Sequence, residues 1–234
     1  FQSLDESEQE KRMMIAQLSH DIKTPITSIQ VTVEGILDGV IKEEERLHYL
    51  STIGRQTDRL NKLVEELDVL TLNTQPQDTA DEEVEEIFLD QLLIESMSEF
   101  QLQIEQEERD VYIQVSPESA KIKSHSDKLS RILVNLLNNA FKYSEPGTRI
   151  EVLAQLTEQE LTISVKDEGQ GILPEDLGKI YKRLYRVETS RNMKTGGHGL
   201  GLAIARELAH QLGGEITAES QYGLGSKFTF SLSL

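Results

Sequence analysis

The chain has 234 residues, enough for one large domain or two small ones. Its 24 lysines and arginines against 41 aspartates and glutamates give a net charge of −17, which argues against nucleic acid or anionic lipid as a partner. The chain has no cysteine, which excludes disulfides and cysteine-ligated metals, and no stretch approaches the ~20 apolar residues of a membrane-spanning helix.

The first residues, Phe1-Gln2-Ser3, lack an initiator methionine and are similar to the end of a cleavable tag. We therefore expect residues 1–8 to be a tag remnant and the start of a connecting helix. The chain would then be a fragment of a longer protein.

Residues 9–73 are predicted to form an antiparallel helical hairpin. Apolar residues recur at a spacing of seven before a turn at Leu37–Gly39, and the same spacing recurs from about Lys42 to Leu72. Two helices alone leave one apolar face open, and two copies of the chain would cover it by closing a four-helix bundle. We therefore expect a homodimer. The series are Ile15, Ile22, Ile29 and Ile36; Ile26, Val33 and Val40; and Ile53, Leu60 and Leu67.

The first of these helices carries His20 beside Asp21, with Pro25 little more than one turn further on. An interior proline costs roughly 3 kcal/mol, because it removes one backbone hydrogen bond and clashes with the carbonyl four residues back. We interpret Pro25 as a kink that lets the upper helix bend while the lower bundle stays packed. The alternative is that the packing merely tolerates it.

Residues 74–84 are polar and contain a proline, so they are predicted to be a linker. Residues 85–234 mix helical patterns with short alternating runs, which is typical of a two-layer α/β sandwich. The fold class is thus α+β with two domains. Helices are predicted at Leu89–Glu105, Ser126–Tyr143 and Leu200–Leu212, and strands at Val111–Val115, Arg149–Leu156, Leu161–Lys166, Glu215–Glu219 and Lys227–Ser233.

One helix face and two glycine-rich loops of this domain are candidates for chemistry. Asn135, Asn139 and Lys142 share a face, where amide oxygens could bind Mg²⁺ and the lysine a phosphate; the alternative is a solvated polar face. Asp167 ends a strand and is followed by Gly169 and Gly171. The two glycines could let the backbone approach a ligand closely; the alternative is an ordinary turn after the strand. Thr195–Ile204 runs from glycines into an apolar helix, an arrangement that suits an anion.

Five motifs in this order make the chain similar to the sensor histidine kinases of two-component systems, from about Gln9 onward. Each motif is weak alone, but the ordered set is specific. The resemblance implies a dimerisation and phosphoacceptor hairpin over residues 9–73, followed over residues 85–234 by the ATP-binding sandwich of gyrase-type and chaperone-type ATPases. The motifs are a phosphoacceptor box at Ser19–Pro25, an N box at Asn135–Tyr143, glycine boxes at Asp167–Ile172 and Gly197–Leu202, and an F box at Ile180–Arg186.

The resemblance implies that the second domain binds ATP and Mg²⁺. Asn135 and Asn139 would lie beside the metal and the phosphates, Lys142 would contact phosphate, and Tyr143 would lie near the nucleotide. Asp167 would accept a hydrogen bond from the adenine amine. The remaining nucleotide positions would be Gly169, Gly171, Arg186, Gly197, Gly199, Leu200 and Gly201, with a mobile lid from about Lys182 to His198.

In this family, the boxed histidine takes the γ-phosphoryl group of ATP and passes it to an aspartate of a response regulator. His20 would therefore be an exposed phosphoacceptor, and Asp21 would orient its ring and hold or take the proton of the other ring nitrogen. Thr24 would position a water that dephosphorylates the regulator. The family usually has an N-terminal membrane sensor, so the chain is expected to be the cytoplasmic portion of a bacterial cell-membrane protein.

The chain departs from the family pattern in three boxes, one of them the first glycine box, where Glu168 and Gln170 stand in place of smaller or different residues while both glycines are kept. Lys23 stands where arginine is commoner, and Tyr181 and Leu184 stand where phenylalanines are typical, so seating of the lid is the property most affected. Two other functions remain open: a scaffold that holds nucleotide without transfer, and an ATPase switch of the chaperone type. Phosphate retained on the protein would separate a kinase from both.

Overall fold

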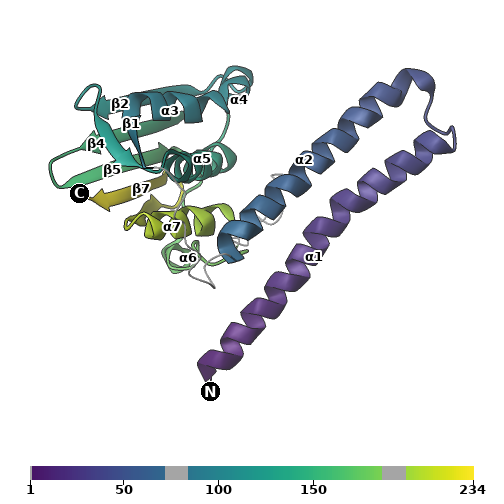
Figure 1. Cartoon of the computed structure of the whole chain (residues 1–234), viewed down its shortest axis with the longest axis horizontal. Helices are drawn as coiled ribbons and strands as arrows, with labels where there is room; N and C mark the ends of the chain where they lie inside the picture. Colours follow the sequence, from purple (N-terminus) through teal and green to yellow (C-terminus); the bar gives the residue numbers. More distant parts are fainter. Residues whose placement is uncertain (1, 72–83, 186–198) are drawn as a thin grey trace. The chain divides into compact units, whose positions relative to one another are not determined.

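The computed structural model describes residues 2–71, 84–185 and 199–234 (Figure 1). The chain divides into two units, residues 1–71 and residues 72–234. Most of the predicted linker, residues 74–84, lies outside the described residues, so the predicted domain limits stay a prediction. None of the helices in the described ranges combines the length and the hydropathy needed to cross a bilayer.

The first unit is a helical hairpin, as predicted. Helix α1 (Gln2–Leu37) is followed by a short 3₁₀ helix, η1 (Glu43–Glu45), and by helix α2 (Arg46–Thr71), which packs against α1. The turn begins where the sequence predicts it, and Gly39 adopts a φ of +69° there, a conformation that glycine reaches without steric cost. Residues 2–8 continue α1 at its N-terminal end.

The two apolar series of α1 differ in exposure. Ile22, Ile29 and Ile36 are half-buried, although Ile15 of the same series is 62% exposed, whereas Ile26 and Val33 of the other series are 47% and 38% exposed. A single chain therefore leaves an apolar face of α1 uncovered. The predicted four-helix bundle would cover this face with a second chain.

Helix α1 passes through Pro25 without interruption (Figure 1). Just before the proline, the Thr24 hydroxyl donates to the carbonyl of His20 at 3.0 Å. A bond of this kind back to the preceding turn supplies a second donor to that carbonyl and tends to bend a helix slightly. The kink expected at Pro25 does not end the helix, and its role as a hinge stays a prediction.

The second unit contains a five-stranded mixed sheet in the order β2-β4-β5-β7-β6. Strands β2 and β4 pair in parallel, and the other three pairs are antiparallel. All five strands were predicted from the sequence, to within two residues at each end. Their bounds are Asp110–Ser116 for β2, Arg149–Leu156 for β4, Glu160–Asp167 for β5, Glu215–Gln221 for β6 and Gly225–Ser233 for β7.

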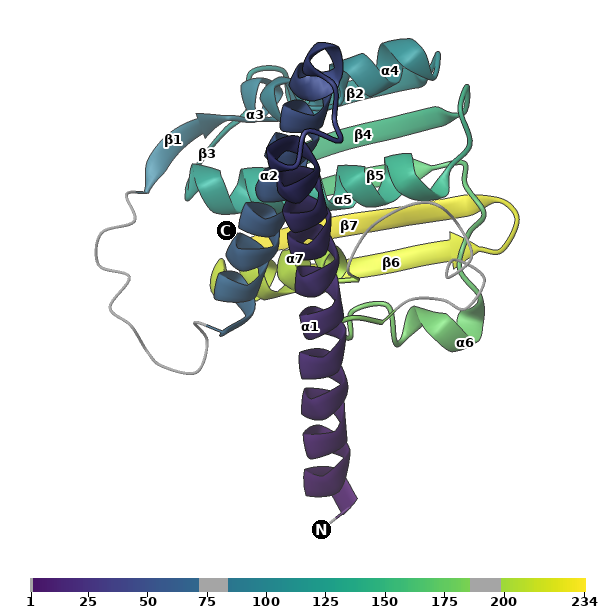
Figure 2. The same ribbon diagram turned by 90° about the vertical axis from the view of Figure 1, so that its right-hand side faces the viewer.

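Helices α3 (Leu89–Ser98), α5 (Ser126–Tyr143) and α7 (Gly201–Gln211) form the second layer on one face of this sheet (Figure 2). Side chains alternate along the strands, so apolar residues reach the helices and polar ones face away. This confirms the predicted two-layer sandwich. The core between the layers includes Leu129, Leu133, Leu136, Leu137, Ile150, Val152, Val165, Ile204, Ala205, Phe228 and Phe230.

The predicted helix Leu89–Glu105 is wrong in its length. It is two helices, α3 and α4 (Gln101–Gln106), separated at Phe100. The ring of Phe100 is buried and stacks on the ring of Phe141 with centroids 4.7 Å apart. That contact comes from a helix distant in the sequence, so the local pattern could not reveal the break.

Three short elements were not predicted. Strands β1 (Glu85–Phe88) and β3 (Lys121–Ser124) form a separate antiparallel pair, and α6 (Pro174–Leu177) is a single turn of helix. The strand pair is held by its side chains as well, because Lys121 contacts both the Glu86 carboxylate at 3.0 Å and the Phe88 ring at 4.2 Å.

Candidate functional site

Helix α5 presents its polar residues on the face away from the core, as predicted. Asn135, Asn139 and Lys142 are half-buried, whereas Leu136 and Leu137 are fully buried. The Asn135 amide donates to the carbonyl of Arg131 at 2.8 Å, and a side chain at Gly201 would place its Cβ 2.9 Å from the Asn135 oxygen. The first residue of α7 therefore lies beside this polar face.

Asp167 ends strand β5 as a buried carboxylate, 3% exposed. Its Oδ1 accepts the backbone N–H of Gly169 at 2.8 Å and that of Ser226 at 3.3 Å. Burial raises the pKa of Asp167 to about 6, because the charged form is poorly solvated, and the two N–H donors offset part of that rise. The result is a fixed acceptor at the end of the central strand of the sheet.

The loop after Asp167 lies directly against the end of α5. The N–H of Gln170 donates to the carbonyl of Tyr143 at 3.1 Å. A Cβ at Gly169 would lie only 2.2 Å from that same carbonyl oxygen, so no side chain fits there. This contact brings together Asp167 and the last turn of α5, which carries Lys142 and Tyr143.

A turn between β6 and β7 supports the loop from its other side. The N–H of Gly223 donates to the carbonyl of Gln170 at 2.7 Å, and the N–H of Ile172 donates to the Ser220 hydroxyl at 2.8 Å. Gly171 has a φ of +69°, and its Cβ would lie 2.2 Å from the Gln221 carbonyl oxygen. The hairpin between β6 and β7 therefore supports the glycine box at Asp167–Ile172.

The second glycine box is described only from Gly199 onward. Gly199 has a φ of +72°, and its carbonyl accepts the N–H of Leu184 at 2.9 Å, while Leu200 is buried. Arg186 and Gly197, with most of the predicted lid over residues 182–198, lie outside the described residues.

His20 lies on the first unit with its side chain 77% exposed, as its predicted role requires. Its Nδ1 lies 3.4 Å from Oδ1 of the half-buried Asp21. A carboxylate at this nitrogen favours the tautomer with the proton on Nδ1 and leaves a lone pair on Nε2. The arrangement presents a nucleophilic nitrogen to solvent.

Two known domain families match the chain. Residues 10–75 match the His Kinase A (phospho-acceptor) domain, and residues 124–234 match the histidine kinase-, DNA gyrase B- and HSP90-like ATPases. The chain belongs to the histidine kinase family. The fold predicted from the sequence, a helical hairpin followed by a sandwich of this ATPase type, is confirmed.

Comparison with individual proteins also finds histidine kinases. Histidine protein kinase SaeS of Staphylococcus epidermidis is 39% identical over 229 residues, which cover 96% of this chain and 64% of the relative. Among solved structures, histidine kinase AdeS of Acinetobacter baumannii has a TM-score of 0.71 at 26% identity, covering 92% of this chain and 97% of that one. The histidine kinase ThkA, solved with the response regulator protein TrrA, shares the fold with a TM-score of 0.69 at 21% identity over 99% of this chain and 66% of that one.

The ATPase domain of this histidine kinase chain has features that suit a nucleotide. A buried acceptor at Asp167, backbone without side chains at Gly169 and Gly171, and the cationic Lys142 surround one junction. Across the described ranges there is no cluster of three or more acidic or histidine side chains that could hold a metal ion.

Two contacts near the site were not predicted from the sequence. Arg109, which no motif includes, is buried and bonds to the end of α5. The Tyr185 hydroxyl donates to the buried carboxylate of Asp176 at 2.6 Å, which fixes the F box where the described segment ends. Both join residues that neither periodicity nor a motif connects.

The buried charge of Asp167 predicts a pH-dependent stability. Between about pH 4 and 6 the folded protein keeps a proton that the unfolded chain has released, since the pKa rises from 3.8 to about 6 on folding. The free energy of unfolding of the wild type should therefore fall, relative to Asp167→Asn, as the pH rises through this window, by on the order of 3 kcal/mol. Urea unfolding at several pH values measures it.

The matched control is Asp110→Asn, because the Asp110 side chain is 66% exposed. Its free energy of unfolding should follow that of the wild type across the same window. A difference between wild type and Asp167→Asn that does not change with pH would contradict the raised pKa.

Proposed function

We propose that the chain is an ATP-dependent protein histidine kinase that phosphorylates His20 and then transfers the phosphoryl group to an aspartate of a response regulator. The observation that carries this proposal is the pairing, in one chain, of an exposed histidine beside a carboxylate with a glycine-lined ATPase-type junction. An ATPase switch of the chaperone type would have no use for the first of these.

The ATP site would lie at the junction of α5 with the loop after β5. Asp167 would accept a hydrogen bond from the adenine amine, and the missing side chains at Gly169 and Gly171 would let the base approach the backbone. Tyr143 would lie beside the nucleotide, and Lys142, whose ammonium lies 4.9 Å from the centre of the Tyr143 ring, would reach the phosphates.

Asn135 and Asn139 would hold Mg²⁺ together with the phosphates. Their amide oxygens are the hard ligands that this ion accepts, and it usually keeps several waters and binds with substrate phosphates rather than in an all-protein cage. When bound, the metal would neutralise phosphate charge. Arg186 and the positions Gly197, Gly199, Leu200 and Gly201 would contribute to the same phosphate end.

The transfer would use the lone pair on Nε2 of His20. It attacks the γ-phosphorus, a P–N bond forms, and the bond from that phosphorus to the bridging oxygen breaks to release ADP. The imidazole becomes positively charged in this step while Nδ1 keeps its proton. Asp21 beside Nδ1 would stabilise that charge and orient the ring.

The partners would be a second copy of the chain and a response regulator. The exposed series Ile26, Val33 and Val40 is an apolar face that a four-helix bundle would cover. ThkA, of the same fold, forms a complex with a response regulator, as its structure records. As in the sensor kinases that the sequence resembles, we propose that the chain works on the cytoplasmic side of a cell membrane.

Phosphate labelling tests this function directly. Incubation with γ-labelled ATP and Mg²⁺ should give the wild type a label that is stable to alkali and labile to acid, as expected of a phosphohistidine. His20→Gln should lose the label, since the amide is not a nucleophile of this kind. His48→Gln is the matched control, because His48 is an exposed histidine on the other helix of the hairpin, and it should keep the label.

A wild type that binds ATP but retains no phosphate would contradict the kinase and favour the nucleotide-holding scaffold. Release of phosphate with no label on the protein would instead favour an ATPase switch.

We also propose that Thr24 supports dephosphorylation of the regulator by positioning a water one turn from His20. In the structure its hydroxyl donates to the His20 carbonyl, so the oxygen has lone pairs available to a water. Thr24→Ala should slow regulator dephosphorylation by about tenfold while leaving autophosphorylation nearly unchanged, because only the first reaction needs the water. Release of phosphate from the labelled regulator measures it.

Thr32→Ala is the control for this substitution. The Thr32 hydroxyl makes the same kind of bond, to the carbonyl of Ser28 at 2.8 Å, on the same helix but away from His20. Equal rates of dephosphorylation for Thr24→Ala and Thr32→Ala would argue against a role for Thr24.

A further inference from the structure

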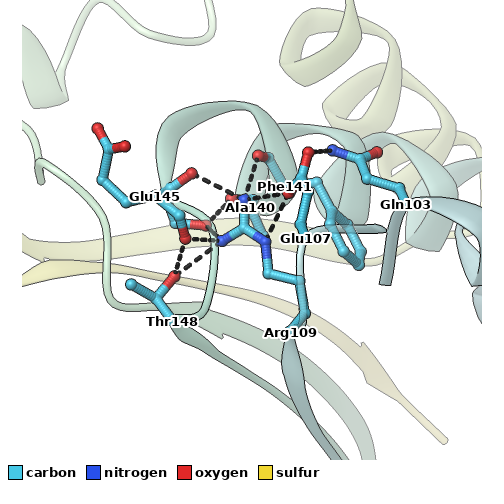
Figure 3. Close-up of polar contacts among 8 residues, drawn as sticks. Gln103, Glu107, Arg109, Ala140, Phe141, Glu145 and Thr148 are labelled. Carbon is cyan, nitrogen blue, oxygen red and sulfur yellow. Dashed lines mark hydrogen bonds and ion pairs between the residues drawn. The ribbon is translucent and has the colours of Figure 1, made fainter. Parts of the chain in front are cut away.

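Arg109 is a buried cation immediately before strand β2. The residue is 7% exposed, and only 1% of its side-chain surface reaches solvent. Its Nε and Nη2 both lie 2.7 Å from Oε2 of Glu107, which is oriented in turn by the amide of Gln103 at 2.9 Å (Figure 3). A buried charge of this kind lowers the stability of the fold unless it is paired and hydrogen-bonded. The acceptors of its other N–H groups therefore show which part of the fold Arg109 holds.

Those other donors point at the C-terminal end of α5 (Figure 3). Nη2 donates to the carbonyls of Phe141 and Ser144 at 3.2 and 2.9 Å. Nη1 donates to the hydroxyls of Ser144 and Thr148, each at 2.8 Å, and to the carbonyl of Glu145. The last carbonyls of a helix have no partner within it and carry partial negative charge, so a guanidinium is well suited to hold them.

The same turn of α5 is held from a second direction by the nucleotide loop. The Tyr143 carbonyl accepts the N–H of Gln170, while the Ala140 carbonyl accepts the Ser144 hydroxyl, which Arg109 also contacts. The side chains of Lys142 and Tyr143 therefore extend from a helical turn whose backbone is held by two separate attachments. Arg109 supplies one of the two attachments.

We propose that Arg109 is a positioning residue of the ATP site, which acts by fixing the last turn of α5 and thereby the side chains of Lys142 and Tyr143. The inference rests on the proposed function, because it assigns these two side chains to the nucleotide. Arginine is needed here because its planar fork reaches acceptors on several sides, whereas a lysine ammonium has three donors at a single point.

Nucleotide affinity of the full chain tests the proposal. Arg109→Lys keeps the charge but loses the fork, and it should weaken ADP binding by about tenfold, the effect expected when several charge-assisted hydrogen bonds to the helix end are lost. Arg149→Lys is the matched control, because the Arg149 side chain is 43% exposed and lies over Tyr112 rather than α5. Its ADP affinity should equal that of the wild type.

A double-mutant cycle separates positioning from a general loss of stability. If Arg109 acts through Lys142, then Arg109→Lys should weaken binding much less in a Lys142→Ala background than in the wild type. Fully additive effects would overturn the proposal, as would unchanged affinity in Arg109→Lys.

Amide hydrogen exchange without nucleotide keeps this test independent of the proposed function. Arg109→Lys should raise exchange about tenfold at residues 140–144 while leaving the middle of α5 near the wild-type rate, because only the end of the helix loses its partners. Unchanged exchange there would overturn the positioning role even if ADP binds. Faster exchange in a chain whose wild type binds no nucleotide would instead refute the proposed function alone.

If Arg109→Lys does not fold, Glu107→Gln offers a milder change. It removes the ionic partner and leaves the bonds from the guanidinium to the helix. A smaller shift in the same direction, in affinity and in exchange, is expected. No shift in either readout would contradict the proposal.

Discussion

The hydrogen bond from the Gln170 N–H to the Tyr143 carbonyl is the contact on which the rest of the site depends. It joins the end of helix α5 to the loop that follows strand β5, two segments that meet only because the helix packs across the sheet. Gly169 is required beside it, since any Cβ would clash with the same oxygen. The junction therefore has a fixed shape before any ligand arrives, which lowers the entropy cost of binding.

Charge imposes a second constraint on this junction. The chain carries a net charge of −17, so a nucleotide with several negative charges approaches an unfavourable field. Local features must offset that field at the phosphate end, where Lys142 and the proposed metal would lie. Asp167 adds one more buried carboxylate, but in the proposed arrangement it lies at the other end of the site, as the acceptor for the base. The proposed division of the site into a base end and a phosphate end keeps these charges apart.

Much of this site could be predicted from the sequence, since its parts are local patterns. Helix α5 is strongly amphipathic, so periodicity alone gave both its ends and its polar face. Strands β1 and β3 are four residues long, and each contributes only one or two apolar residues, which is too short a pattern to detect. The break at Phe100 was missed because it depends on a ring contributed by another helix.

Arg109 was missed for the same physical reason. Its partners on α5 and in the following turn lie 32 to 39 residues further along the chain, so no local spacing connects them. From the sequence, a single arginine before a strand would be expected on the surface. In the fold, Arg109 is buried against the end of α5. Contacts of this kind hold a motif in position without belonging to it, and sequence motifs do not record them.

We propose that nucleotide binds at the junction between Asp167 and the end of α5. Titration calorimetry with ADP on the full chain tests it most directly, with Asp167→Asn compared against the exposed Asp110→Asn. We expect a single site per chain. Its affinity should fall at least about tenfold in Asp167→Asn, because the charged acceptor for the base is lost, and should be unchanged in Asp110→Asn. Equal affinities for all three proteins, or no binding by the wild type, would contradict it.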